Sequence, residues 1–134
     1  MLNENENNKS NQENNDNCVF CKIVQKELPA EIVFENKNIL VFKDIHPIAP
    51  IHLLIIPKKH IKSLNELTEK DQQLVGEMII VGKNLAHDLK ISEKGYKILF
   101  RIGEDGGQEV PHLHLHLIGG APLYEEIRPL NNSV

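Results

Sequence analysis

The segment Pro111-His-Leu-His-Leu-His-Leu-Ile118 alternates histidine with leucine. Alternate side chains of a β-strand share a face, so His112, His114 and His116 point one way while the intervening leucines point into the core. Imidazoles in this arrangement lie about 7 Å apart along the strand. A solvent-facing strand without a function is the plain alternative, but three aligned histidines bring no gain in packing. The pattern predicts a strand over 112–118 that carries a row of functional histidines.

The rest of the body predicts an α+β domain, beginning with a short helix over 19–24. Strands are predicted where β-branched and aromatic residues gather, over 31–35, 39–43, 53–56 and 96–102. Thr68 and Asp71 resemble a capping box that begins one long helix, which ends near Lys90. Its apolar face repeats at steps of three and four residues and consists of Leu74, Met78, Val81, Leu85 and Leu89, widened by Val75, Ile79 and Ala86.

Length and charge limit the classes of protein that fit. The 134 residues suffice for one domain, which we place at 18–134, after an Asn-rich tail at 1–17 that is expected to be disordered. A formal net charge of −4 argues against a nucleic-acid binder or an anionic-membrane binder, and an apolar run such as Leu53 to Ile56 is too short to span a bilayer. No export signal is recognisable, so we expect a cytoplasmic protein, with nuclear entry open at this size.

The histidine row and the loop before it suit phosphate chemistry. Imidazole has an unperturbed pKa near neutrality, and its neutral nitrogen is a competent nucleophile toward phosphorus. Gly106-Gly107-Gln108 precedes the strand, and two glycines let the backbone approach a ligand and hold an anion with its N–H groups. An ordinary hairpin loop is the alternative. Its place beside the histidine row favours an anion-binding loop.

A C-x-x-C pair stands directly after the Asn-rich tail, as Cys18-Val-Phe-Cys21. A redox dithiol is one interpretation, but that motif usually follows a strand and begins a long helix, and neither is expected here. Two plain buried thiols are a second interpretation. A structural zinc site with two histidines as further ligands is the third, because Cys₂His₂ is an ordinary zinc-binding set. The residues alone leave the second and third interpretations open.

Taken together, these residues resemble the histidine triad (HIT) superfamily, most closely its Hint branch of small nucleotide phosphoramidases. Residues 112–118 match the family signature, in which three histidines alternate with apolar residues. The similarity runs from about Val19 to Gly120, with further matches in order and spacing at 26–30, 42–45, 49–50, 56–60, 81–83 and 106–108. The resemblance implies the HIT α+β fold, an antiparallel sheet with one long helix that dimerises into a continuous sheet.

The resemblance also implies a role for each matching residue. His114 matches the nucleophile, which attacks the α-phosphorus and forms a nucleotidyl-histidine intermediate. His116 matches the partner that binds the phosphate and assists proton transfer, and His52 and His112 match supporting histidines. Asp44 matches the carboxylate that binds both ribose hydroxyls. The apolar walls around the base match Phe20, Ile23, Phe42 and Ile45, and the phosphate cradle matches Gln108 with the backbone of Gly107 and Val110.

The activity that the resemblance implies is hydrolysis of purine nucleoside 5′-phosphoramidates, or of related nucleotidyl adducts, with release of AMP. No cofactor is implied for the chemistry itself. The alternatives are a dinucleoside polyphosphate hydrolase and a zinc-stabilised nucleotide-binding scaffold with little turnover. Some Hint-like members bind a structural zinc ion, and the matching ligands are Cys18, Cys21, His60 and His112. An exposed loop histidine is the alternative for His60.

Three positions depart from the branch's usual pattern. Lys43 stands where histidine is frequent beside the ribose, Arg101 replaces an asparagine near the phosphate, and Glu109 replaces a hydroxyl residue that relays a proton to the leaving group. We count Arg101 among the nucleotide-binding residues and Glu109 among the supporting ones, although a carboxylate acts as an acid only if its pKa is raised. The segment 121–134 also differs from the family's usual tail. These departures bear on the leaving group and the rate, and leave the reaction class intact.

Overall fold

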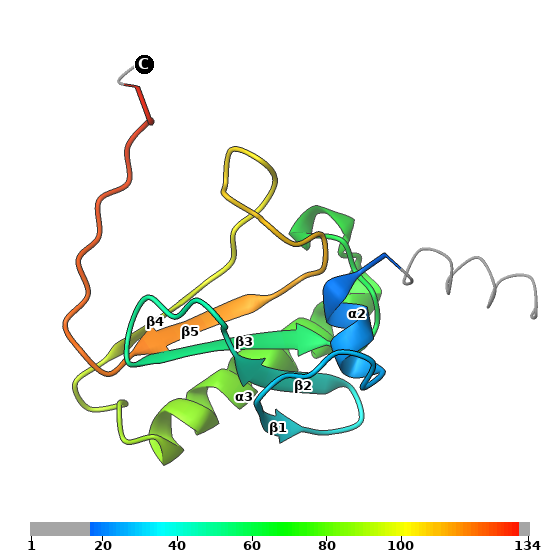
Figure 1. Cartoon of the computed structure of the whole chain (residues 1–134), viewed down its shortest axis with the longest axis horizontal. Helices are drawn as coiled ribbons and strands as arrows, with labels where there is room; N and C mark the ends of the chain where they lie inside the picture. Colours follow the sequence, from blue (N-terminus) through cyan, green and yellow to red (C-terminus); the bar gives the residue numbers. More distant parts are fainter. Residues whose placement is uncertain (1–16, 132–134) are drawn as a thin grey trace, which may run out of the picture.

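A computed structural model describes residues 17–131. The tail expected at 1–17 lies outside this range except for Asn17, so its disorder stays a prediction. The elements, in chain order, are helix α2 (Val19–Val24), strands β1 (Ile32–Glu35), β2 (Ile39–Lys43) and β3 (Ile51–Pro57), the 3₁₀ turns Leu64–Glu66 and Glu69–Asp71, helix α3 (Gln72–Asp88), and strands β4 (Tyr96–Leu99) and β5 (Leu115–Gly119) (Figure 1). No helix within 17–131 is both long enough and apolar enough to cross a membrane.

The five strands form one antiparallel sheet in the order β1-β2-β3-β5-β4. β3 lies at the centre, and β1 and β4 are the edges (Figure 1). β3 is longer than predicted, and β1 and β4 are shorter. The α+β class, the antiparallel sheet and the single long helix are confirmed. The dimer expected with this fold stays a prediction.

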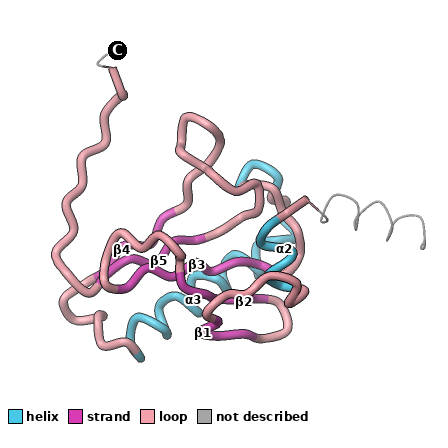
Figure 2. The backbone as a smooth tube through the Cα atoms, viewed as in Figure 1, coloured by secondary structure: helices cyan, strands magenta, loops and turns pink. Residues whose placement is uncertain are grey.

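Side chains of the sheet alternate between two faces. On one face Val41, Ile55 and Leu117 belong to a core with Met78 and Leu85 of α3, which runs along the sheet in Figure 2. The opposite face packs against α2, and that cluster consists of Cys18, Phe20, Cys21, Ile23, Leu40, Phe42, Leu54 and Ile56. The triad leucines lie in the α3 core. The histidines between them therefore belong to the face that carries α2.

The histidine strand begins later than predicted. β5 starts at Leu115 rather than at residue 112. Because Ile55 of β3 pairs with Leu115, Leu113 falls opposite Pro57, which has no N–H to donate. The Leu113 N–H donates instead to the Ile61 carbonyl at 2.6 Å. The alternation of side chains persists although the regular ladder has ended.

The long helix begins with the predicted capping box. The Thr68 side chain accepts a backbone bond and Asp71 accepts from the Thr68 N–H, but the box closes a 3₁₀ turn before α3 begins. Lys90 has a left-handed φ of 62°, which cannot continue the helix. Ile79 and Leu89, expected on the buried face, are 40% and 39% exposed. The buried stripe of α3 is therefore narrower than the periodicity predicted.

Candidate active site and metal centre

His112 faces two cysteine sulfurs. Its Nδ1 lies 3.3 Å from Cys18 Sγ and 3.5 Å from Cys21 Sγ, and Nδ1 of His60 lies 3.2 Å from Cys21 Sγ. The other nitrogen of His112, Nε2, donates to the Pro57 carbonyl at 2.8 Å, so Nδ1 carries the lone pair in the neutral ring. Burial lowers the pKa of His112 to about 4, which favours that neutral ring. The ring therefore directs a lone pair at the cysteines.

These four residues fit a zinc ion. Their ligand atoms all lie within 4.8 Å of one another. Zn–S bonds of about 2.3 Å and Zn–N bonds of about 2.0 Å place tetrahedral ligand atoms roughly 3.3–3.8 Å apart, so only small shifts are needed. Burial, followed by the neighbouring Cys18, raises the pKa of the Cys21 thiol to about 12. A bound cation would stabilise the thiolate that burial disfavours, so the donor set suits a structural zinc site.

His114 presents its other nitrogen to the site. Its Nδ1 donates to the His112 carbonyl at 2.7 Å, which leaves the lone pair on Nε2. The Phe20 ring packs edge-on against the imidazole, with centroids 5.2 Å apart at 88°. Burial is the main cause that lowers the pKa of His114. A neutral imidazole with a free Nε2 is the nucleophilic form of histidine.

His52 links His116 to Asp44. The Ile48 N–H donates to His52 Nδ1 at 3.2 Å, so the proton of the neutral His52 ring is on Nε2. That Nε2 lies 2.9 Å from His116 Nδ1 and 3.3 Å from Asp44 Oδ2. His116 accordingly accepts at Nδ1 and carries its own proton on Nε2. Burial, then the neighbouring His114, lowers the pKa of His116 to about 3, which favours the neutral ring in the free protein.

Arg101 reaches the same histidine from the strand-to-loop segment after β4. Its Nη1 lies 3.2 Å from His116 Nε2. Sequence reasoning placed Arg101 near the phosphate but did not find this contact. It also missed the Pro57 carbonyl and the Ile48 N–H, which fix the tautomers of two histidines. Backbone atoms from other parts of the chain leave no signal in the motif itself.

The residues expected around the base are only partly brought together. Phe20 and Phe42 pack edge-on with ring centroids 5.3 Å apart, and Ile23 is buried in the same cluster. Ile45 is 82% exposed and lies outside that cluster. Asp44 is half-buried at the end of β2 and accepts the His46 N–H at 2.9 Å. The wall is therefore built by three residues in this structure, and contact of Ile45 with a base stays a prediction.

The hydrogen-bond donors of Gly107 and Gln108 in the glycine loop bond to acceptors of the protein itself. The Gly107 N–H donates to Glu104 and the Gln108 N–H to Gly103, at 3.0 Å each. The Gln108 amide donates to the Lys62 and Val110 carbonyls at 2.7 and 3.1 Å, and its oxygen accepts from Gly103. Gln108 thus holds the loop closed. In this arrangement Gly107 and Gln108 have no free donor for a phosphate. The carbonyl of Val110, the third member of the expected cradle, accepts from Gln108, and its N–H takes no part in these bonds.

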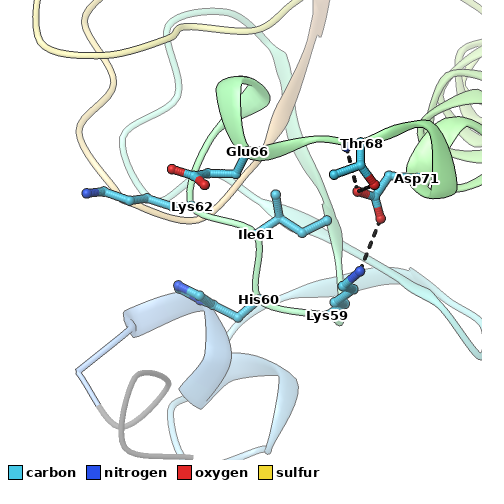
Figure 3. A pocket seen from close by; sticks show the side chains of 7 residues that line it. All are labelled: Lys59, His60, Ile61, Lys62, Glu66, Thr68 and Asp71. Atoms are coloured by element: carbon cyan, nitrogen blue, oxygen red, sulfur yellow. Dashed lines mark hydrogen bonds and ion pairs between the residues drawn. The ribbon is translucent and has the colours of Figure 1, made fainter. Parts of the chain in front are cut away.

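Two open hollows flank this region. One of about 560 Å³ borders the loop and is lined by Lys62, Ser63, Gly103, Glu104, Gly107, Gln108, Glu109 and Pro111. The other, of about 540 Å³, lies beside His60, and Figure 3 shows Lys59 reaching across to Asp71, which also bonds Thr68. The second hollow borders His60 of the candidate zinc site and is not lined by His114 or His116. Glu109 is exposed in the first, where its charge raises the pKa of His114 slightly against the effect of burial.

Comparison with known proteins identifies the family. The family model described as scavenger mRNA decapping enzyme C-term binding matches residues 17–124. A HIT family hydrolase from Legionella pneumophila Philadelphia 1 superposes with a TM-score of 0.79 at 53% identity, over 81% of this chain and 96% of that one. The chain belongs to the histidine triad superfamily. The HIT resemblance of the sequence is therefore confirmed.

Relatives within the superfamily support a hydrolase. The purine nucleoside phosphoramidase of Escherichia coli (strain K12) is 41% identical over 105 residues, which are 78% of this chain and 88% of that protein. Protein HitA of Neisseria gonorrhoeae is 46% identical over 104 residues, 78% of this chain and 96% of that protein. A zinc-bound histidine triad family protein from Mycobacterium smegmatis has a TM-score of 0.72 at 31% identity, covering 88% of this chain and 87% of that one.

Proposed function

We propose that this protein hydrolyses purine nucleoside 5′-phosphoramidates, or related nucleotidyl adducts, and releases AMP. The observation that carries the proposal is the hydrogen bond from His114 Nδ1 to the His112 carbonyl, which leaves Nε2 of a neutral, buried imidazole free. The His116 ring lies 5.0 Å away between centroids and carries a proton on its outer nitrogen. A nucleophile and a hydrogen-bond donor therefore lie side by side.

The reaction takes two displacements. His114 Nε2 attacks the α-phosphorus, and the bond from phosphorus to the leaving amine breaks. The bound anionic phosphate raises the pKa of His116, so this ring becomes charged in the complex and gives its proton to the departing amine. Water then attacks the phosphorus, the bond to His114 breaks, and His116 takes the proton back. The balance closes with AMP, the amine and the original enzyme.

Recognition of the nucleoside rests on two contrasting groups. Asp44 offers a carboxylate that can accept from both ribose hydroxyls. Phe20 and Phe42 offer only apolar ring surfaces, which cannot read the polar edge of a base. We therefore assign strong ribose recognition and weak base selectivity to this site. The Escherichia coli relative at 41% identity, a purine nucleoside phosphoramidase, supports a purine substrate.

A structural zinc ion is a further part of the proposal. Cys18, Cys21, His60 and His112 would hold it and so tie α2 to the segment that carries the triad. A closed four-ligand site contributes stability and no chemistry. The zinc-bound Mycobacterium smegmatis neighbour supports this assignment.

We also propose a homodimer in the cytoplasm. β4 is an edge of the sheet, and its Ile98 is 39% exposed, while Ile80 on α3 is 53% exposed. A second copy would cover such apolar surface and extend the sheet. Multi-angle light scattering of the purified chain tests the dimer, because a monomer mass would contradict it.

Turnover of adenosine 5′-phosphoramidate tests the proposed activity. The wild type and His87→Ala, a control at an exposed histidine of α3, should release AMP, and His114→Ala should not. Mass spectrometry of the quenched wild type should find AMP bonded to His114. A rate that survives in His114→Ala contradicts the mechanism. Faster cleavage of a diadenosine polyphosphate would favour the dinucleotide alternative, and nucleotide binding without turnover would favour the scaffold.

A further inference from the structure

Two hydrogen-bond donors meet at the outer edge of the triad. Arg101 Nη1 lies 3.2 Å from His116 Nε2. A guanidinium has donors only, and His116 Nε2 carries the ring's proton because Nδ1 accepts from His52. In the other tautomer of His116, its Nδ1 would carry the proton and His52 Nε2 would have to accept it. The proton of His52 would then be on Nδ1, where it would oppose the Ile48 N–H that already donates to this atom. No proton arrangement of the neutral rings satisfies this chain of contacts.

An anion between the two groups would resolve the mismatch. Arg101 and His116 would each donate to one of its oxygens, and the guanidinium would add a full positive charge. His116 lacks such a charge in the free protein, since burial lowers its pKa. The positive charge of Arg101 is among the causes that lower the pKa of His116.

Two residues of the neighbouring loop already use their hydrogen-bond donors. The Gly107 and Gln108 N–H groups and the Gln108 amide are used within the loop or on Lys62 and Val110. The arginine stem lies against this loop. A Cβ at Gly107 would be in ordinary contact with Arg101 Cδ, at 3.4 Å, and the φ of +82° at Gly107 is the feature that favours glycine there.

We propose that Arg101 and His116 hold one anionic phosphate group between them, with Arg101 as the residue that makes binding depend on the charge of that group. The inference rests on the proposed function for the identity of the anion as a nucleotide 5′-phosphate. It goes beyond it in assigning affinity for the phosphate mainly to an arginine and not to Gly107 and Gln108. In the free protein the guanidinium occupies the edge of the phosphate position, and it shifts to make way for the ligand.

Calorimetric titrations with inorganic phosphate, AMP and adenosine test the proposal. The variants are Arg101→Asn, Arg101→Lys, which keeps the charge without the planar fork, and Arg128→Asn as the matched control, since Arg128 pairs with Glu126 in the C-terminal segment. Ionic strength is held constant because chloride screens the contact. Circular dichroism and thermal unfolding verify that each variant is folded.

We expect Arg101→Asn to lose binding of inorganic phosphate and to bind AMP at least about tenfold more weakly, as for loss of a hydrogen bond to a charged group. Adenosine affinity should stay within twofold, Arg101→Lys should fall in between, and Arg128→Asn should match the wild type. AMP affinity unchanged in Arg101→Asn overturns the proposal. Equal losses for AMP and adenosine overturn it too, because they indicate a structural role.

The inorganic phosphate titration separates this inference from the proposed function. If phosphate binding depends on Arg101 but the wild type releases no AMP from the phosphoramidate, the proposed activity fails and the anion site stands. If the wild type is active and Arg101→Asn binds phosphate and AMP normally, the anion site fails and the activity stands.

Discussion

His112 and His114 stand two residues apart on the same side of one extended segment, yet they present different ring nitrogens. His112 donates from Nε2 to the Pro57 carbonyl and turns its Nδ1 lone pair to Cys18 and Cys21. His114 donates from Nδ1 to the His112 carbonyl and keeps its Nε2 lone pair for the open site. Both rings are buried and neutral.

The difference shows that a hydrogen bond to a backbone carbonyl determines which ring nitrogen of a histidine carries the lone pair. A neutral imidazole has one donor and one acceptor nitrogen, so fixing the donor fixes where the lone pair points. At residue 112 the lone pair meets two sulfurs, a set suited to zinc. At residue 114 the lone pair has no hydrogen-bond partner within residues 17–131 and is available to a substrate. One repeated motif therefore contributes to both the proposed zinc site and the proposed catalytic site.

Replacing each histidine in turn gives the largest expected contrast. We expect His114→Ala to lower kcat at least about 10³-fold with little change in unfolding temperature, as for loss of a nucleophile. His112→Ala should lower the unfolding temperature and retain a larger share of kcat. Steady-state kinetics and thermal unfolding of both variants check this. Equal losses of kcat at equal stability would remove the distinction between the two centres.

Removal of the metal tests the proposed zinc site at His112 separately from the catalytic site. Stripping zinc with a chelator, or making Cys18→Ser, should cost about 3 kcal/mol of unfolding free energy, roughly 10 °C in Tm for a domain of this size. The effect on kcat at low temperature should be less than about tenfold, because His114 keeps its bond to the His112 carbonyl. Zinc well below one equivalent per chain in the purified protein would contradict the metal centre.

Removal of the Asp44 carboxylate tests the proposed nucleotide-binding site around His114. Asp44→Ala should weaken AMP binding by about 2 kcal/mol, near 30-fold, through loss of hydrogen bonds to a charged group. Binding of 2′,3′-dideoxy-AMP, which lacks both hydroxyls, should change far less. Because Asp44 also lies 3.3 Å from His52, thermal unfolding serves as the control for structural damage. If the wild type binds the two nucleotides equally, Asp44 does not read the ribose.

The smallest expected effect is a loss of stability in acid. Burial holds the pKa of His116 at about 3, below the 6.5 of the unfolded chain, so unfolding takes up a proton below pH 6.5. Stability from this group is present above pH 6.5 and is lost as the pH falls, by about 1 kcal/mol between pH 6.5 and 5.5. Urea unfolding of the zinc-free protein measures it, and His116→Gln should flatten the slope. An identical slope in His116→Gln would show that other groups cause the loss.

Much of the fold follows from local patterns. The helix at 19–24, the capping box at Thr68 and the strands around β3 are encoded by propensity and periodicity within a few residues. The alternation at 112–118 places the leucines in the α3 core and the histidines on the other face, as predicted. The start of β5 was predicted wrongly, because it depends on Pro57 of a strand that is distant in the chain.

The sequence by itself determined the row of histidines, the cysteine pair and the glycine loop, since each is a short stretch with its own chemistry. Only the tertiary structure determined which hydrogen bonds these residues form with one another and with the rest of the chain. The Pro57 carbonyl that fixes the His112 tautomer comes from 55 residues away, and the Arg101 contact with His116 needs the segment after β4 to lie against β5. Ring tautomers and opposed donors depend on differences of a few tenths of an ångström in the distances between separate elements. No local sequence pattern encodes such differences.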